Sequence, residues 1–214
     1  NPTSILIHEL TKETKKYATV ALAGDGGDEI FGGYPRYEAA LLYNKIKFVP
    51  RLIWKALNPF FMLISEDISG NHKLRRVKTF VNSLSKPVDE MYEDWVAYFS
   101  INEINTLFKV QQDFDRVVLE VFNAIPTNDL IIKASITDLK TFLVNNLLAY
   151  GDAMSMANSF EVRLPLIDHR IIEFMTSISS DYRIKNGQTK YLMKKLLKGK
   201  VPDEIINKPK LGLN

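Results

Sequence analysis

A glycine-rich segment with several carboxylates lies near the start of the sequence. Residues 18–34 read ATVALAGDGGDEIFGGY. Asp25 and Asp28 are three residues apart, and carboxylate oxygens suit a Mg²⁺ ion that bridges to a phosphate better than they suit a bare phosphate. The neighbouring glycines allow the backbone to approach a ligand closely. The alternative is a capping turn, in which Asp28 caps a helix and Glu29 lies in its first turn.

A strand must position this segment. Residues 19–23 form a short run that is β-branched at its start and bounded by Gly24, which predicts a buried strand. Ligands of open parallel sheets bind beyond the carboxyl ends of strands, where these glycines lie. One strand cannot make a sheet. Either this sequence pairs it with a strand that gives no clear signal, or the partner strands belong to upstream sequence.

Helices account for most of the remaining sequence. Apolar periodicity and turn signals predict an N-terminal helix that ends near Tyr17 and further helices at about 36–47, 51–64, 72–83, 88–98, 114–124, 129–149, 168–178 and 189–198. Thr127, Asn128 and Asp129 offer N-cap groups for the longest of them. The expected fold is mostly α with one short buried strand at about 19–23, the back half of an α/β protein.

Composition excludes several classes of protein and of site. The 214 residues are 46% hydrophobic and 25% charged, which excludes a disordered or collagen-like chain. The sequence has no cysteine and only three histidines, so it offers no disulfide, no thiolate zinc site and no cysteine nucleophile. No apolar run approaches the roughly 18 residues that a membrane span needs. A reducing, cytoplasmic location without membrane contact is the expectation.

Basic residues gather at the C-terminal end. Residues 181–214 contain nine lysines and arginines against three carboxylates. Such a segment could contact nucleic acid or a small polyanion such as a triphosphate, and the alternative is a solvated lysine-rich helix face. Aromatic residues do not alternate with these lysines as they do on single-strand binding surfaces, so nucleic acid is not the expected partner.

Four blocks of the sequence resemble one enzyme family. Residues 18–34 resemble the SGDGGDELFGGY signature of glutamine-dependent asparagine synthetases, in their C-terminal ATP-pyrophosphatase domain. Residues 151–170 are similar to the family's DRMSMAHSLEVRVPFLDHR, 187–195 to GKTKYLLRKA, and 201–213 to LPEEILNRKKQGF. The resemblance implies that residues 1–214 are a partial synthetase domain of the adenine-nucleotide α-hydrolase-like (PP-loop) class, with the glutaminase domain absent.

Residue roles follow from this resemblance. Ala23, Gly24 and Gly26 would line the adenylate pocket through backbone groups, and Asp28 would be a Mg²⁺ ligand. Asp25 stands where the family often has Glu, and its implied role is that of a base toward the attacking ammonia.

Lys190 would lie on the phosphates and neutralise charge on the leaving pyrophosphate; taken alone, it reads as an exposed lysine at a helix start. His169 is expected to help cap a helix. Weaker candidates are Asp152, Glu161, Arg163, Lys208 and Lys210. The first three could equally form an internal ion-pair network.

The family's reaction is a carbon–nitrogen ligation. It implies that an aspartate side-chain carboxylate attacks the α-phosphorus of MgATP, pyrophosphate leaves, and ammonia attacks the β-aspartyl-AMP. ATP and Mg²⁺ are the implied cofactors, ammonia would come from a glutaminase domain missing here, and a homodimer is possible. The given sequence lacks the family's SGGxDS loop and its N-terminal cysteine, so the isolated chain is expected to be inactive.

Two other interpretations remain open. Similar enzymes transfer an amide to a carboxylate of a cell-surface sugar or peptide, and the acceptor pocket cannot be read from these blocks. In the other interpretation, the chain is a helical binding module without chemistry of its own. Such a module would use its basic C-terminal segment to contact a partner or nucleic acid.

Overall fold

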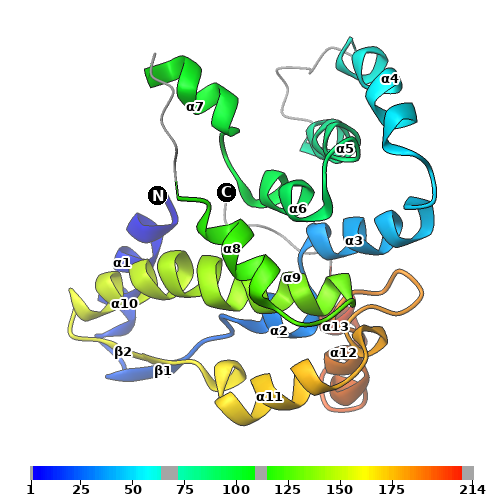
Figure 1. The fold of residues 1–214 in the computed structure, drawn as a ribbon. Coiled ribbons are helices and arrows are strands. Elements are labelled where there is room, and N and C mark those ends of the chain that lie inside the picture. Colours follow the sequence, from blue (N-terminus) through cyan, green and yellow to red (C-terminus); the bar gives the residue numbers. More distant parts are fainter. Residues whose placement is uncertain (1, 64–71, 109–114, 209–214) are drawn as a thin grey trace. The chain divides into compact units, whose positions relative to one another are not determined.

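The structure, a computed structural model, describes residues 2–63, 72–108 and 115–208. The chain divides into two compact units, one formed by Asn1–Tyr34 with Ile131–Asn214 and the other by Pro35–Leu130 (Figure 1). Every candidate site residue that the structure describes belongs to the first unit.

The first unit contains a sheet of two parallel strands, β1 (Val20–Leu22) and β2 (Glu161–Arg163), shown side by side in Figure 1. Val20 pairs with Glu161 and Leu22 with Arg163. The predicted strand is confirmed, and its partner is a strand of this sequence that gives no clear signal. The prediction of a single strand is therefore wrong.

The predicted burial of β1 is also wrong. Val20 is 37% exposed and Leu22 is 73% exposed. Side chains alternate between the two faces of a strand, and only the middle residues, Ala21 and Val162, are half-buried. An apolar run predicts burial on both faces, but two strands present one open face with Val20 and Leu22 on it.

The first unit contains a long helix, whose first residue, Leu130, is the last residue of the second unit. It runs from α9 (Leu130–Asp138) through a π-helical segment, η1 (Leu139–Leu148), into α10 (Ala149–Met156). The helix predicted at 129–149 is confirmed and extends further. Its N-terminal signal is confirmed in part, because the Thr127 hydroxyl accepts the N–H of Asp129 at 3.2 Å. At the other end α10 packs against α1 (Pro2–Thr14) and leads into β2.

The core of the first unit forms around a short helix, α2 (Gly27–Phe31). Ile30, Phe31 and Met175 are buried there. Apolar side chains pack around them from η1, from the turn η2 (Pro165–Ile167), from α11 (His169–Ser177) and from α12 (Tyr191–Leu197). Two short helices complete the unit, η3 (Ser180–Tyr182) and α13 (Asp203–Ile206). The core therefore fixes the helix that carries Asp28.

The second unit is helical in its described residues. Its helices are α3 (Pro35–Ile46), α4 (Arg51–Met62), α5 (His72–Ser83), α6 (Val88–Val96), α7 (Ile101–Phe108) and α8 (Val117–Ala124). α5 packs between α4 and α6, and α6 packs against α8, where the rings of Tyr92 and Phe122 stack 5.0 Å apart. All were predicted from the sequence except α7. None of the described helices is long and apolar enough to cross a membrane.

Candidate functional site

The turn after β1 is shaped by glycine. The Gly27 N–H donates to the Gly24 carbonyl at 3.2 Å, and Gly26 has a φ of 81°. A Cβ at Gly26 would lie 2.1 Å from Cγ2 of Ile167, so both backbone conformation and space require glycine there. Gly24 and Asp25 are exposed at the tip of the turn. The turn thus holds the Asp25 carboxylate in the open, beyond the carboxyl end of the strand.

Asp28 does not cap α2. The N-cap residue is Gly26, which has no side chain to accept a hydrogen bond, and Asp28 lies in the first turn of the helix. The capping interpretation of Asp28 is therefore wrong. Its side chain is 20% exposed and instead forms an ion pair.

Asp28 pairs with Lys190. The Lys190 Nζ lies 2.7 Å from Oδ1 of Asp28, and the lysine side chain is 31% exposed. Lys190 precedes α12 with a φ of 54°, a left-handed conformation that is uncommon for a residue with a side chain. The lysine is at a helix start as expected, but it is half-buried rather than solvated. The structure thus joins two residues that the sequence placed in separate motifs.

Gly33 borders this ion pair closely. A Cβ at Gly33 would lie 1.9 Å from Oδ1 of Asp28 and 2.5 Å from Cε of Lys190. The Gly33 N–H also donates to the Asp28 carbonyl at 2.8 Å. The missing side chain of Gly33 makes the room that the ion pair occupies. Sequence reasoning gave this glycine no role, although its place in the Gly-Gly-Tyr end of the motif was a signal.

Buried polar contacts at Glu29 hold α2 in place. Glu29 is fully buried, and the Tyr34 hydroxyl donates to its Oε1 at 2.7 Å. The Tyr34 ring meets Phe142 of η1 edge to face, 6.0 Å between centroids. The Ser135 hydroxyl of α9 donates to the Glu29 carbonyl at 2.6 Å. These contacts anchor the helix that carries Asp28 to the long helix.

The Glu29 carboxyl is electrostatically perturbed. Burial raises its pKa, and the hydrogen bond from Tyr34 opposes that shift. The carboxylates of Asp138 and Asp28 raise the pKa further. Tyr34 is half-buried, and its hydrogen bond stabilises the ionised form of this buried acid.

The weaker candidates lie elsewhere in the first unit. Glu161 and Arg163 pair with each other at 2.8 Å, but their side chains are 53% and 65% exposed. Both point to the same side of β2, since they are two residues apart. The predicted internal ion-pair network is thus a surface pair, and Asp152 is exposed.

The remaining candidates can be placed briefly. Ala23 continues the β1 pairing, because its N–H donates to the Arg163 carbonyl at 2.9 Å. Lys208 is exposed after α13, and Lys210 lies outside the described residues. Asp168, not His169, caps α11, and it accepts the Arg170 N–H at 2.9 Å. His169 is the first residue of this helix and does not cap it, so the capping role expected of His169 is wrong.

The site suits a metal that arrives with phosphates. In the part of the chain that the structure describes, no three His, Cys, Asp or Glu side chains gather as a metal cage. Mg²⁺ commonly uses one or two protein carboxylates together with substrate phosphates. Asp28 offers such a carboxylate, and Lys190 offers a cation for the phosphates. The donor set therefore fits Mg²⁺ bound as a phosphate complex.

Comparisons with known proteins agree on one family. The family model described as asparagine synthase matches residues 1–214. Asparagine synthetase [glutamine-hydrolyzing] 1 of Bacillus subtilis is 30% identical, and the match covers 99% of this chain and 33% of that protein. A putative asparagine synthetase of Mycobacterium bovis is 26% identical, with 99% of this chain and 32% of that protein covered. No solved structure matches the chain significantly.

Proposed function

The chain belongs to the asparagine synthase family, and from this membership we propose that it takes part in the MgATP-dependent conversion of a carboxylate, aspartate first, to its amide. The chain spans about a third of the length of the curated relatives described above. The reaction of the whole protein is therefore part of the proposal. The observation that carries it is the Asp28–Lys190 pair at the carboxyl end of β1.

Asp28 and Lys190 are proposed to share the phosphates of ATP. Mg²⁺, when bound, would offset the negative charge that builds on the leaving pyrophosphate. Asp28 would hold the metal and Lys190 would hold phosphate oxygens, so each exchanges its present partner for the ligand. Their 2.7 Å contact keeps both side chains oriented toward one point before the ligand binds. We propose the same adenine-nucleotide α-hydrolase-like class for the fold.

The turn residues are proposed to serve the adenylate. Ala23, Gly24 and Gly26 would contact the nucleotide through backbone groups, since the turn leaves little side-chain bulk in the way. Asp25 would take a proton from the attacking ammonia as the amide forms, because an amine must lose protons in that step. Its exposed position at the tip of the turn allows it to reach an acceptor.

Asparagine formation is the direct test. The longest protein that the coding sequence specifies is incubated with MgATP, aspartate and ammonium, and asparagine, AMP and pyrophosphate are measured. The proposal expects the three products in equal amounts. Glutamine replaces ammonium in a second reaction, and its use would identify a glutaminase partner. The 214-residue chain alone is expected to form no product, because its sequence contains no SGGxDS-like loop.

The acceptor carboxylate is tested in the same assay. A panel that replaces aspartate with glutamate, a uronic acid and a peptide carboxylate distinguishes asparagine formation from amidation of a sugar or peptide. If AMP appears only with one of the latter, the family reaction stands and aspartate is the wrong substrate. If no carboxylate yields AMP, the chain is a binding module and the proposed chemistry is wrong.

A further inference from the structure

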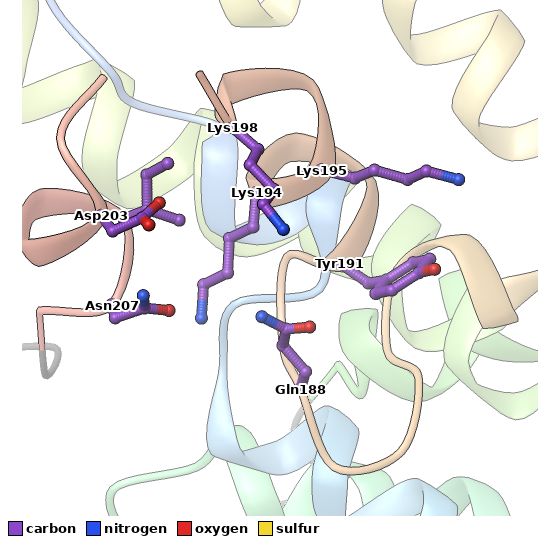
Figure 2. A pocket seen from close by; sticks show the side chains of 8 residues that line it. Gln188, Tyr191, Lys194, Lys195, Lys198, Asp203 and Asn207 are labelled. Atoms are coloured by element: carbon purple, nitrogen blue, oxygen red, sulfur yellow. The ribbon is translucent and has the colours of Figure 1, made fainter. Parts of the chain in front are cut away.

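A second basic site lies beside α12. A pocket of about 320 Å³ opens between the loop before α12, the helix itself and α13 (Figure 2). Its lining residues are Gln188, Tyr191, Lys194, Lys195, Lys198, Asp203, Ile206 and Asn207. Lys190 and Asp28 are not among them. Pockets of this size are large enough for a small ligand.

Two lysines of the pocket lie in a row of regularly spaced lysines that begins with Lys190 of the candidate site. Lys190, Lys194 and Lys198 follow at four-residue intervals, and backbone hydrogen bonds of 2.9 and 3.1 Å link each to the next. Residues four apart lie above one another on a helix, with Cβ atoms roughly 5–6 Å apart. Lys190 at one end meets Asp28, whereas the other two line the pocket.

The charges in the pocket are not balanced. Three lysines and one carboxylate, Asp203, line it. Within the described ranges, none of Lys194, Lys195 and Lys198 forms an ion pair. Figure 2 shows Lys194 directed toward the region between the amides of Gln188 and Asn207, while Lys195 extends away from them. An excess of positive charge around a pocket attracts an anion.

We propose that this pocket binds a phosphate chain, that is, an anion with two or more linked phosphates. Lysine ammonium groups bind phosphate as point charges, and amide side chains add hydrogen-bond donors. Lys194 and Lys198 are the cations that the proposal requires, with Gln188 and Asn207 as neutral donors. The phosphates can come from free inorganic pyrophosphate or from a nucleotide.

A small anion fits better than nucleic acid. The pocket is partly open to solvent and has one aromatic side chain, Tyr191. The Lys185 ammonium lies 5.3 Å from the centre of its ring. Single-strand binding surfaces instead use a groove with several stacking aromatics. The proposal does not depend on the amide-forming reaction, because it concerns lysines other than Lys190.

Titration calorimetry with inorganic pyrophosphate tests the site in the full chain. The double variant K194Q/K198Q should weaken pyrophosphate binding by about tenfold or more, because two charge-assisted contacts are lost. K194R/K198R, which keeps both charges, should bind within about threefold of the unmodified chain. Lys200 follows the helix, is exposed and does not line the pocket, so K200Q is the matched control and should change binding little. Thermal unfolding of each variant shows that it is folded.

The outcomes separate this proposal from the proposed function. If K194Q/K198Q binds pyrophosphate as the unmodified chain does while K190Q does not, the phosphates bind at the Asp28 site alone, and the pocket proposal is wrong. Equal weakening by K200Q would mean a general charge effect and would also overturn it. Tighter binding of an oligonucleotide than of pyrophosphate, lost in K194Q/K198Q, would assign the pocket to nucleic acid instead.

Two ligands identify the source of the phosphates. Tripolyphosphate and ATP carry the same three-phosphate chain, and both should compete with pyrophosphate whereas AMP should not. If ATP binds at least as tightly as tripolyphosphate, the pocket accepts a nucleotide. If ATP binds more weakly, the pocket accepts the free inorganic chain. Competition by AMP as strong as that by ATP would show that the phosphate chain is not what is recognised.

Discussion

The ammonium group of Lys190 lies 2.7 Å from Oδ1 of Asp28, although the two residues come from opposite ends of the described chain. One follows the first strand and the other precedes α12. Both side chains are only partly exposed, so their attraction is less screened than that of a surface pair. The proposed metal ligand, Asp28, and the proposed phosphate ligand, Lys190, therefore lie at one site.

Gly33 should not tolerate a side chain. In G33A the new methyl group would overlap Asp28 Oδ1 and Lys190 Cε, so the ion pair must move. We expect about 100-fold lower asparagine-forming activity, because small displacements of reacting groups are costly, and a loss of about 1–3 kcal/mol in unfolding free energy from overpacking. Activity at wild-type level with unchanged thermal stability would show that the ion pair is not held as the structure has it.

Gly151 provides the matched glycine control. It lies inside α10, and a Cβ there would meet nothing within 4 Å. G151A should raise the unfolding free energy by roughly 0.5–1 kcal/mol, because alanine loses less backbone entropy in a helix. Urea unfolding measures the gain, and activity should not change. A loss of stability would mean that this face of α10 is covered.

Glu29 should make stability depend on pH. Its pKa is raised by burial, so the folded state holds the proton more tightly than the unfolded state does. The contribution of protonated Glu29 to the free energy of unfolding is fully present below the ordinary glutamate pKa. It is lost as pH rises through the raised pKa of the folded state. E29Q keeps the shape and the acceptor for Tyr34, so its melting temperature should fall less over that range. Parallel melting curves against pH for E29Q and the unmodified chain would contradict this.

Tyr34 should stabilise the chain through its hydroxyl. Y34F keeps the edge contact with Phe142 but removes the hydrogen bond to Glu29. A buried acceptor that loses its donor costs about 1–3 kcal/mol in unfolding free energy, measurable by urea unfolding. In the double variant E29A/Y34F the two losses should not add, because either substitution alone already removes this hydrogen bond. Full additivity would show that the two side chains do not interact.

Local signals predicted most of the helices but not the pairing of distant segments. The helix at 72–83 has the bounds of α5, because its period and its flanking turns agree. The π-helical geometry of η1 has no such signal in its sequence. β2 could not be predicted, because a three-residue strand with Glu161 and Arg163 on its open face carries no apolar alternation.

Helix α7 was missed although it carries a recognisable start signal. The Ser100 N–H donates to the Glu103 carboxylate at 2.7 Å, and the Glu103 N–H donates back to Oγ of Ser100 at 3.3 Å. These two hydrogen bonds form a capping box. Its sequence signal is a serine followed three residues later by a glutamate. At the site, the residue types of Asp28 and Lys190 were foreseen, whereas their contact and the role of Gly33 depend on the tertiary fold.

Aspartate-dependent exchange of labelled pyrophosphate into ATP tests the central claim most directly. It requires the phosphate site and the carboxylate, but no ammonia. The longest encoded protein should catalyse exchange only with aspartate and Mg²⁺ present. D28N and K190Q should each lower the exchange rate by about 100-fold, since each removes a charge that faces the phosphates, while G151A should not. Exchange at the unmodified rate in K190Q and D28N would contradict the account.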